Sequence, residues 1–261
     1  MNEHDIRIGT CGFSYKDWRG LFYPEELKPA DYLSWYAGRF RFVEIDYTYY
    51  KRPVAAESEK LCDRVSDTFL FSVKTTGRLT HDRDEEWLKE AQLFTEGVQP
   101  YLDAKKLGAV LAQFPYSFHY TPENRMYLSR FCDAMSKLPL CVEFRNAEWQ
   151  KTSVYEGLTQ RGVCLVQPDL PRLKGLPSAD GKVTGNTGYV RFHGRNTNSW
   201  WQGDNVSRYD YLYSDDELTA WVETILDMAL KVDRLFLAFN NHHKGQAVKN
   251  AFSLQKLLGD M

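Results

Sequence analysis

The chain has 261 residues, of which 43% are hydrophobic and 26% are charged. This balance is typical of a globular protein and excludes intrinsically disordered, collagen-like and coiled-coil chains. The 33 basic and 35 acidic residues give a formal net charge of -2, so no overall field draws the chain to nucleic acid or to an anionic membrane. Aromatic residues reach 15%, which predicts a large aromatic core or an aromatic-lined site.

The cysteines and the apolar stretches bear on the cellular compartment. Cysteine occurs at Cys11, Cys62, Cys132, Cys141 and Cys164, an odd number without a CxxC spacing. Most of them lie inside apolar runs, which is typical of buried reduced thiols. No stretch approaches roughly 18 consecutive apolar residues, and the first ten residues lack the apolar core of a signal peptide. We therefore expect a reducing, cytoplasmic location and no membrane partner.

Short runs rich in β-branched and aromatic residues recur along the chain and predict β-strands. The eight runs are residues 6–11, 41–46, 69–74, 108–114, 140–145, 163–169, 189–194 and 234–240. Apolar residues at three- and four-residue spacing predict helices in most of the gaps. These helices are 29–40, 53–65, 85–102, 122–138, 153–162, 214–231 and 245–259. Ser214 and Glu217 form a capping box at the start of the sixth helix.

Strands and helices alternate until eight strands have been used, which predicts an α/β fold with a single (β/α)8 TIM-barrel-like domain over 1–261. The alternative is an open doubly wound sheet, which usually has a dinucleotide turn with three glycines after its first strand. Here Gly9 and Gly12 are followed by aromatic residues instead. Segments 170–188 and 195–213 depart from the alternation. We expect these loops, the second of them rich in aromatics, at the carboxyl-terminal face where barrels carry function.

Charged residues occupy alternate positions in several predicted strands. Because alternate side chains of a barrel strand face the helices and the interior, the charged set should point inward or to the upper mouth. We expect this orientation for Glu44, Asp46, Lys74, Gln113, Glu143, Arg145, Arg191 and His193. Three carboxylates here balance three cations, so a structural salt-bridge network is one interpretation. We favour a functional site, because barrel enzymes place their chemistry at the carboxyl ends of the strands.

Two further features predict ligand contacts near the same face. Gly245 begins the last helix, whose free backbone amides could bind an anion together with Arg191, Lys244 and Asn241. The plainer interpretation is a turn glycine beside a solvated lysine. Aromatic and polar residues are interleaved in 13–20 and 198–202. Such segments either stack sugars or bases or pack over the barrel mouth, and in both cases they would form the wall of a pocket.

Metal-dependent and covalent chemistry are alternatives. Histidines lie near several predicted strand ends, but no HxH or HExxH motif occurs, and the best ligand set would be His193, Glu143 and Asp169. Lys74 could form a Schiff base if it were neutral, but a lysine beside carboxylates is more often an ion-pair member. Cys11 lies at an apolar strand end, where a structural thiol is the usual state. We predict no metal ligand and no specific cofactor.

Seven ordered sequence blocks connect these residues with a known family. The blocks are GTCGFSYKDWRGLFYP, VEIDYTYYKRP, KTTGRLTHD, LAQFP, VEFRNAEW, YVRFHGR and FNNHHKGQAVKNA. Together they resemble the domain of unknown function 72 family over nearly the whole chain. The resemblance implies a TIM-barrel-like fold and no established reaction. Its motif positions fall on Trp18, Gly20, Glu44, Lys74, Thr80, His81, Gln113, Glu143, Arg145, Trp149, Arg191, His193, Gly194, Asn240, Asn241 and Asn250. Asp46 and Tyr50 depart from the commoner VEIN and FYxxP pattern.

We predict an enzyme that acts by acid/base chemistry on a polar small molecule, anionic, phosphorylated or sugar-like. The predicted catalytic residues are Glu44, Glu143, Lys74 and His193. The predicted substrate-binding residues are Trp18, His81, Gln113, Arg145, Trp149, Arg191, Asn240 and Asn241. The alternatives are a metal-dependent phosphoester hydrolase or nuclease, and a non-catalytic module that binds a nucleotide or nucleic acid. The near-neutral net charge disfavours a broad nucleic-acid surface.

Overall fold

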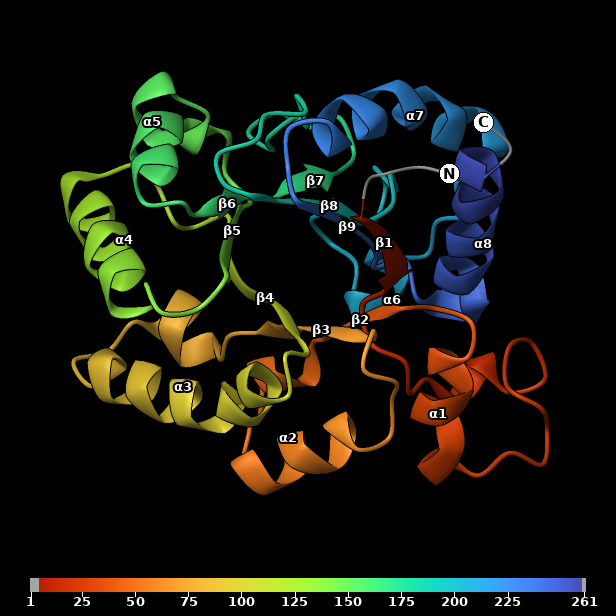
Figure 1. Cartoon of the computed structure of the whole chain (residues 1–261). Coiled ribbons are helices and arrows are strands. Elements are labelled where there is room, and N and C mark those ends of the chain that lie inside the picture. Colours follow the sequence, from red (N-terminus) through yellow and green to blue (C-terminus); the bar gives the residue numbers. More distant parts are fainter. Residues whose placement is uncertain (1–4, 260–261) are drawn as a thin grey trace.

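The computed structural model describes residues 5–259, so residues 1–4 and 260–261 of the predicted domain lie outside the description. Within this range, nine strands lie at the centre and helices surround them (Figure 1). The strands are β1 (Asp5–Thr10), β2 (Phe42–Ile45), β3 (Leu70–Lys74), β4 (Leu107–Phe114), β5 (Leu140–Phe144), β6 (Cys164–Leu165), β7 (Gln167–Asp169), β8 (Thr187–Phe192) and β9 (Arg234–Phe239). The α-helices are α1 (Tyr32–Ala37), α2 (Ala55–Cys62), α3 (Trp87–Asp103), α4 (Pro122–Ala134), α5 (Thr152–Gln160), α6 (Asn205–Arg208), α7 (Asp215–Ala229) and α8 (Gln246–Gly259).

The strands form two parallel sheets. One has the order β1-β9-β8-β7 and the other the order β2-β3-β4-β5-β6. A parallel bridge between Cys11 and Glu44 connects the end of β1 with β2, and β6 is separated from β7 by Val166 alone. This arrangement of parallel sheets and surrounding helices is an α/β fold consistent with a TIM-barrel-like domain. The predicted count of eight strands in one barrel differs from the observed nine strands in two sheets.

The prediction of one continuous strand over 163–169 is wrong. β6 pairs with β5, whereas β7 pairs with β8. The chain therefore passes from one sheet to the other at Val166, whose amide still donates to the Val142 carbonyl at 2.9 Å. Pro168 in β7 has no N–H to donate, which limits the ladder that this segment can form. An apolar run does not reveal such a change of partner, because both halves are equally hydrophobic.

The predicted helices are present, with ends that differ by a few residues. The predicted helix 29–40 begins instead as a 3₁₀ turn over Pro29–Asp31 and continues as α1. The capping box of α7 is confirmed, since Ser214 Oγ accepts from the Glu217 amide at 3.2 Å and the Glu217 carboxylate accepts from the Ser214 amide at 3.0 Å. Segment 195–213 also contains α6, which was not predicted because four residues are too few to show helical periodicity.

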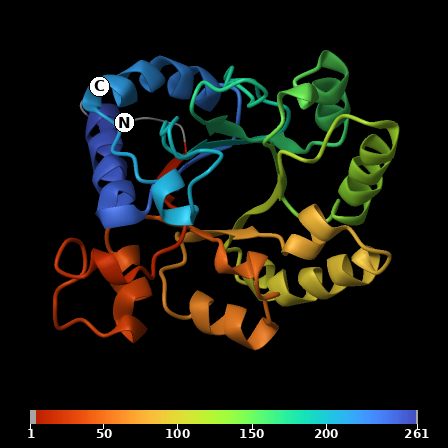
Figure 2. The same ribbon diagram turned by 180° about the vertical axis from the view of Figure 1, so that it is seen from behind.

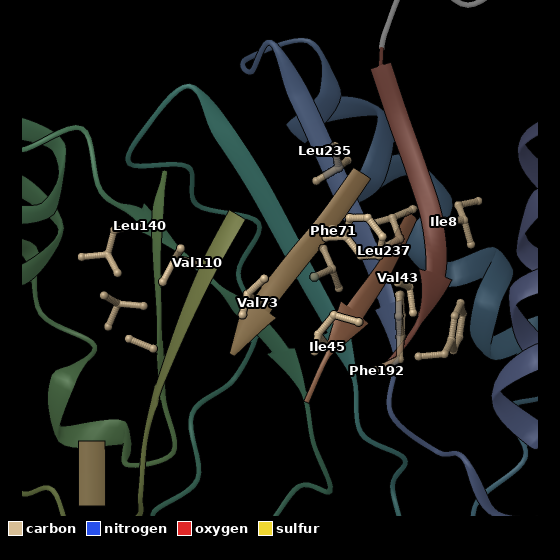
Figure 3. Close-up of a cluster of buried hydrophobic side chains, with 14 of the residues drawn as sticks. Ile8, Val43, Ile45, Phe71, Val73, Val110, Leu140, Phe192, Leu235 and Leu237 are labelled. Carbon is tan, nitrogen blue, oxygen red and sulfur yellow. The ribbon is translucent and has the colours of Figure 1, made fainter. Parts of the chain in front are cut away.

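Two hydrophobic clusters occupy opposite faces of the strands. The larger includes Ile8, Val43, Ile45, Phe71, Val73, Val110, Leu140, Phe192, Leu235 and Leu237, which Figure 3 labels. The smaller includes Phe42, Leu70, Leu111, Tyr189 and Phe236. Side chains two positions further along these strands share the face of the smaller cluster. By this alternation, the smaller cluster fills the amino-terminal half of that face and leaves the carboxyl-terminal half to the charged residues.

The cysteines are all buried free thiols, as the sequence predicts. Among residues 5–259, no helix combines the length and the apolar character that a membrane crossing requires. The cytoplasmic location stays a prediction.

Candidate functional site

A cavity of about 500 Å³ lies at the carboxyl ends of the strands. Successive strand ends contribute polar side chains to its wall, namely Asp46, Lys74, Gln113, Arg145, Arg191 and Asn240. The segment that contains α6 adds Trp200, Trp201, Arg208 and Tyr209. Figure 2 shows α6, in cyan, in front of the central strands. Tyr15, Tyr49, Tyr50, His81, Tyr116 and His242 line the same space.

A buried ion network underlies the cavity and is centred on Arg191. Its Nε and Nη2 donate to Glu44 Oε2 and Oε1 at 2.9 and 2.6 Å, and its Nη1 donates to Glu143 Oε2 at 2.6 Å. The Tyr189 hydroxyl donates to Glu44 Oε2 at 2.7 Å. Both carboxylates are fully buried. Burial alone would raise the pKa of Glu143, but Arg145 and Arg191 hold it well below its usual value, so this carboxylate stays ionised.

His193 extends the network as a neutral imidazole. The Asn240 side-chain nitrogen lies 3.0 Å from His193 Nδ1, and His193 Nε2 lies 3.2 Å from both Glu143 Oε1 and Arg145 Nη2. Burial and the charge of Arg145 lower the pKa of His193 well below its usual value. This histidine therefore orients Glu143 and carries no charge at neutral pH.

Three cationic side chains at the cavity wall keep unused N–H groups. Arg145 bonds Glu143 through Nε and places Nη2 3.2 Å from His193 Nε2, which leaves Nη1 unpaired in the hydrogen bonds found among residues 5–259. Lys74 Nζ donates to Gln113 Oε1 at 3.2 Å. Among the residues that the structure describes, Arg208 makes one long hydrogen bond, from Nη2 to the Gly203 carbonyl at 3.5 Å, and its buried Nε has no partner. Neither Lys74 nor Arg208 has a carboxylate within 4.0 Å in the described part of the chain.

The pKa values of ionisable groups in the cavity are shifted by the positive charge of these side chains. Burial would raise the pKa of Tyr209, but Arg145 and Lys74 bring it below its usual value. Burial and the charge of Lys74 lower the pKa of His81 to about 4. Burial and the charge of Arg191 likewise lower the pKa of Lys74. Cationic side chains that lower the pKa values of these three neighbours also suit the cavity to bind an anion.

The comparisons with known proteins agree with this fold. Residues 7–261 match the family described as Protein of unknown function DUF72. The chain belongs to the DUF72 family. The chain is also 30% identical over 277 residues to UPF0759 protein YunF of Bacillus subtilis (strain 168), an alignment that covers 97% of this chain and 94% of YunF. The family resemblance stated from the seven sequence blocks is confirmed.

Solved DUF72 structures have the same fold. A DUF72 family protein from Thermotoga maritima MSB8 superimposes with a TM-score of 0.91 at 35% identity, covering 98% of this chain and 100% of that chain. A second, from Enterococcus faecalis V583, gives a TM-score of 0.87 at 28% identity, covering 97% of this chain and 95% of that chain. The names of these relatives state no activity, substrate or mechanism.

Of the predicted site residues, half line the cavity of this DUF72 chain. They are Lys74, His81, Gln113, Arg145, Arg191 and Asn240. Glu44, Glu143 and His193 lie in the buried network beneath it. The remaining three occupy other places in the fold: Trp18, Trp149 and Asn241.

The two tryptophans and Asn241 are held by structural contacts. The Trp18 indole donates to the His242 carbonyl at 2.8 Å and packs on Tyr15, so it supports the wall from behind. Trp149 stacks on Phe118 and Phe144 in the core and donates to the Phe118 carbonyl at 2.6 Å. The Asn241 side-chain amide donates to Asn250 Oδ1 at 2.8 Å.

One backbone donor beside the anion site predicted at the start of α8 is already used. The Asp17 carboxylate accepts from the Lys244 amide at 2.7 Å. Arg191 is held by Glu44 and Glu143 instead. Within residues 5–259, no three His, Cys, Asp or Glu side chains could hold a metal ion together. Of the alternative ligand set, Asp169 is paired with Arg195 at 3.0 Å.

The sequence analysis named Tyr15, Trp200 and Trp201 within its aromatic segments, and these side chains do line the cavity. It did not single out four other wall residues, namely Tyr49, Tyr116, Arg208 and Tyr209. Each lies outside the strands, where a period of two gives no orientation. The positions of two of them in the sequence could have indicated that they line the site. Tyr116 follows β4 closely, and Tyr209 belongs to the insertion at 195–213.

Proposed function

We propose that this DUF72 protein is an enzyme that binds a small anionic molecule in the cavity and acts on it by proton transfer. One observation carries the proposal: Lys74, Arg145 and Arg208 present cationic N–H groups to the cavity that no acceptor in the described chain fully uses. Buried donors need acceptors, and an oxyanion supplies several of them together with the opposite charge. The volume of about 500 Å³ suits a small ligand.

Charge and shape narrow the ligand class. Arg191 adds a fourth positive charge, and Glu44 and Glu143 beneath it offset two of the four. A phosphate monoester, as a dianion, would complete this balance. Tyr116 and Trp201 pack edge to face with ring centroids 4.8 Å apart at the same wall, and Trp200 lies nearby. Such aromatic faces favour a ligand with a sugar or base beside its phosphate.

The proposal revises the roles within the predicted catalytic set. Lys74 keeps a role in proton transfer, because its lowered pKa brings it toward the range in which a lysine can exchange a proton. Glu44 and Glu143 become positioning residues for Arg191, and His193 becomes a positioning residue for Glu143. The proposal includes the single (β/α)8 barrel that the sequence predicts. It is supported by the cavity, whose wall contains residues from the carboxyl ends of strands in both sheets.

Binding measurements test the ligand class. We expect sugar and nucleoside monophosphates to bind in calorimetric titrations and their unphosphorylated counterparts not to bind. Arg208→Gln should weaken binding by about tenfold or more, because a charge-assisted hydrogen bond contributes roughly 1.5–3 kcal/mol. Arg64→Gln, at an exposed arginine outside the cavity, is the matched control. Equal binding of uncharged analogues, or full affinity in Arg208→Gln, would contradict the proposal.

Turnover separates an enzyme from a binding module. A bound monophosphate incubated with the protein and followed by phosphorus and proton NMR should be converted. If every sugar and nucleoside monophosphate that binds stays unchanged at saturation, the result would favour the non-catalytic nucleotide-binding alternative.

A further inference from the structure

We propose that Asp46 is the neutral carboxylic acid of the cavity and donates its proton to the bound anion. The inference rests on the proposed function and goes beyond it, because it assigns the donor to a residue outside the predicted catalytic set. Asp46 follows β2 and precedes a 3₁₀ turn over Tyr47–Tyr49.

Position distinguishes Asp46 from the other acidic groups. Among the cavity-lining residues in 5–259, it alone has a carboxyl group. Glu44 and Glu143 lie deeper, and all four of their oxygens accept hydrogen bonds from Arg191 or Arg145. With every one of these oxygens accepting from a guanidinium N–H, neither glutamate has an oxygen left to direct a proton toward the ligand. A proton donated by a carboxyl group to a ligand must therefore come from Asp46.

The hydrogen bonds of Tyr15 indicate the protonation state of Asp46. The Tyr15 hydroxyl donates to the Cys11 carbonyl at 2.7 Å, which uses its single proton. Asp46 Oδ2 lies 3.3 Å from the same phenol oxygen. With the phenol proton directed to Cys11, this contact is attractive when Asp46 supplies the hydrogen. An ionised Asp46 would accept the phenol proton only if that proton left the shorter bond to the Cys11 carbonyl.

The surrounding charges favour the same state. The ionisable groups that influence Asp46, or are influenced by it, come from three strand ends and one turn. They are Tyr15 and Cys11 at the end of β1, Glu44 in β2, Lys74 in β3 and Tyr47 in the following turn. Burial and the charge of Glu44 raise the pKa of Asp46, and the charge of Lys74 opposes them. No cation in the described chain lies within 4.0 Å of the Asp46 carboxyl group. The half-buried carboxyl group thus lacks the close cationic partner that would stabilise its ionised form away from bulk water.

The proposed step transfers one proton. The O–H bond of Asp46 breaks while an O–H bond forms on an anionic oxygen of the ligand. The resulting carboxylate faces Lys74, and the Tyr15 hydroxyl can rotate to donate to it. Solvent water returns the proton to Asp46 after the ligand leaves. A phenol and a lysine beside the acid would make this donation favourable in a positively charged cavity.

The first test is spectroscopic and needs no ligand. An infrared difference spectrum of the parent protein minus Asp46→Asn at pH 7 should contain the carbonyl band of a protonated carboxylic acid. Asp46→Asn should fold, because asparagine has the same shape and occurs at this position in the commoner VEIN pattern. Carboxylate bands in place of the acid band would overturn the proposal.

The second test uses sulfate, a dianion that does not titrate near neutral pH. At pH 6, we expect Asp46→Asn and the parent to bind sulfate with affinities within about twofold, because a neutral group replaces a neutral group. As the pH rises through the ionisation of Asp46, parent binding should weaken, and Asp46→Asn should lack that decrease. Tenfold or tighter binding by Asp46→Asn at pH 6 would show that Asp46 is ionised and would overturn the proposal.

The two tests keep the proposals distinguishable. If neither protein binds sulfate or a monophosphate, the proposed function fails, and the infrared band still decides the protonation of Asp46. If sulfate binds but the acid band is absent, the anion site stands and the role of Asp46 fails. Asp84→Asn, at an exposed carboxylate outside the cavity, is the control for both measurements.

Discussion

Arg191 connects the two strand-end carboxylates that the sequence placed on the interior face. Its guanidinium bonds Glu44 through two nitrogens and Glu143 through the third, and its side chain is only 2% exposed. A buried ion pair contributes little relative to a well-packed apolar replacement, but removal of one partner leaves the other charge without compensation. The position of Arg191 beneath the cavity therefore depends on both glutamates.

We expect Arg191→Met to lower the free energy of unfolding by about 3–5 kcal/mol, because it leaves Glu44 and Glu143 buried without their shared cation. Urea unfolding followed by tryptophan fluorescence measures the change. Arg208→Gln is the control, since Arg208 has no carboxylate partner in the described chain and its loss should cost less than about 1 kcal/mol. A variant Arg191→Met as stable as the parent would show that the network does not depend on this charge.

Two helices illustrate how a glycine can be required by packing or merely tolerated. Gly97 of α3 faces the segment before α2, where an added Cβ would lie 2.2 Å from the Pro53 carbonyl oxygen. Ser58 of α2 donates to the Gly97 carbonyl at 2.7 Å across the same contact. Gly157 of α5 has no atom within 4 Å of its Cβ position. The same substitution should therefore have opposite effects at the two sites.

Gly97→Ala should destabilise the protein by about 1–3 kcal/mol, because the helices must separate to accept the methyl group. Gly157→Ala should stabilise it by up to about 1 kcal/mol, since alanine loses less backbone entropy in a helix. Urea midpoints from far-ultraviolet circular dichroism measure both. Equal effects of the same sign would contradict this account of the α2–α3 contact.

The buried charges also set the response of the whole molecule to pH. Burial and Arg145 lower the pKa of His193 well below 6.5, so below this pH the unfolded chain binds a proton that the folded protein does not. The pKa of Glu143 is depressed as well, so its contribution is present above its ordinary value of 4.5 and is lost as the pH falls further. Both groups make acid destabilising, in successive pH ranges.

We expect the free energy of unfolding to decrease from about pH 6.5 downward and more steeply below about pH 4.5. Urea unfolding at pH 8, 6, 5 and 4 measures this dependence. His81→Gln should reduce the slope between pH 6.5 and 5, because the pKa of His81 is lowered to about 4 in the folded protein. A stability that stays constant from pH 8 to 5 would contradict the neutral state of these histidines.

The sequence by itself determined the properties that repeat along a single strand or helix. A period of two placed Glu44 and Val43 on opposite faces, and it did the same for Glu143 and Val142. The seven family blocks likewise required only the linear order of residues. These predictions succeeded because periodicity and propensity are local properties of the chain.

Tertiary structure alone decided which inward side chains meet. Glu44 and Arg191 are 147 positions apart, and nothing in either strand shows that they form a bidentate pair beneath the cavity. The same holds for Val166, where the chain changes sheets, and for Arg208, which the loop from 195 to 213 brings to the wall. Such contacts depend on strand register, loop path and rotamer together, and these are fixed only when distant segments pack against one another.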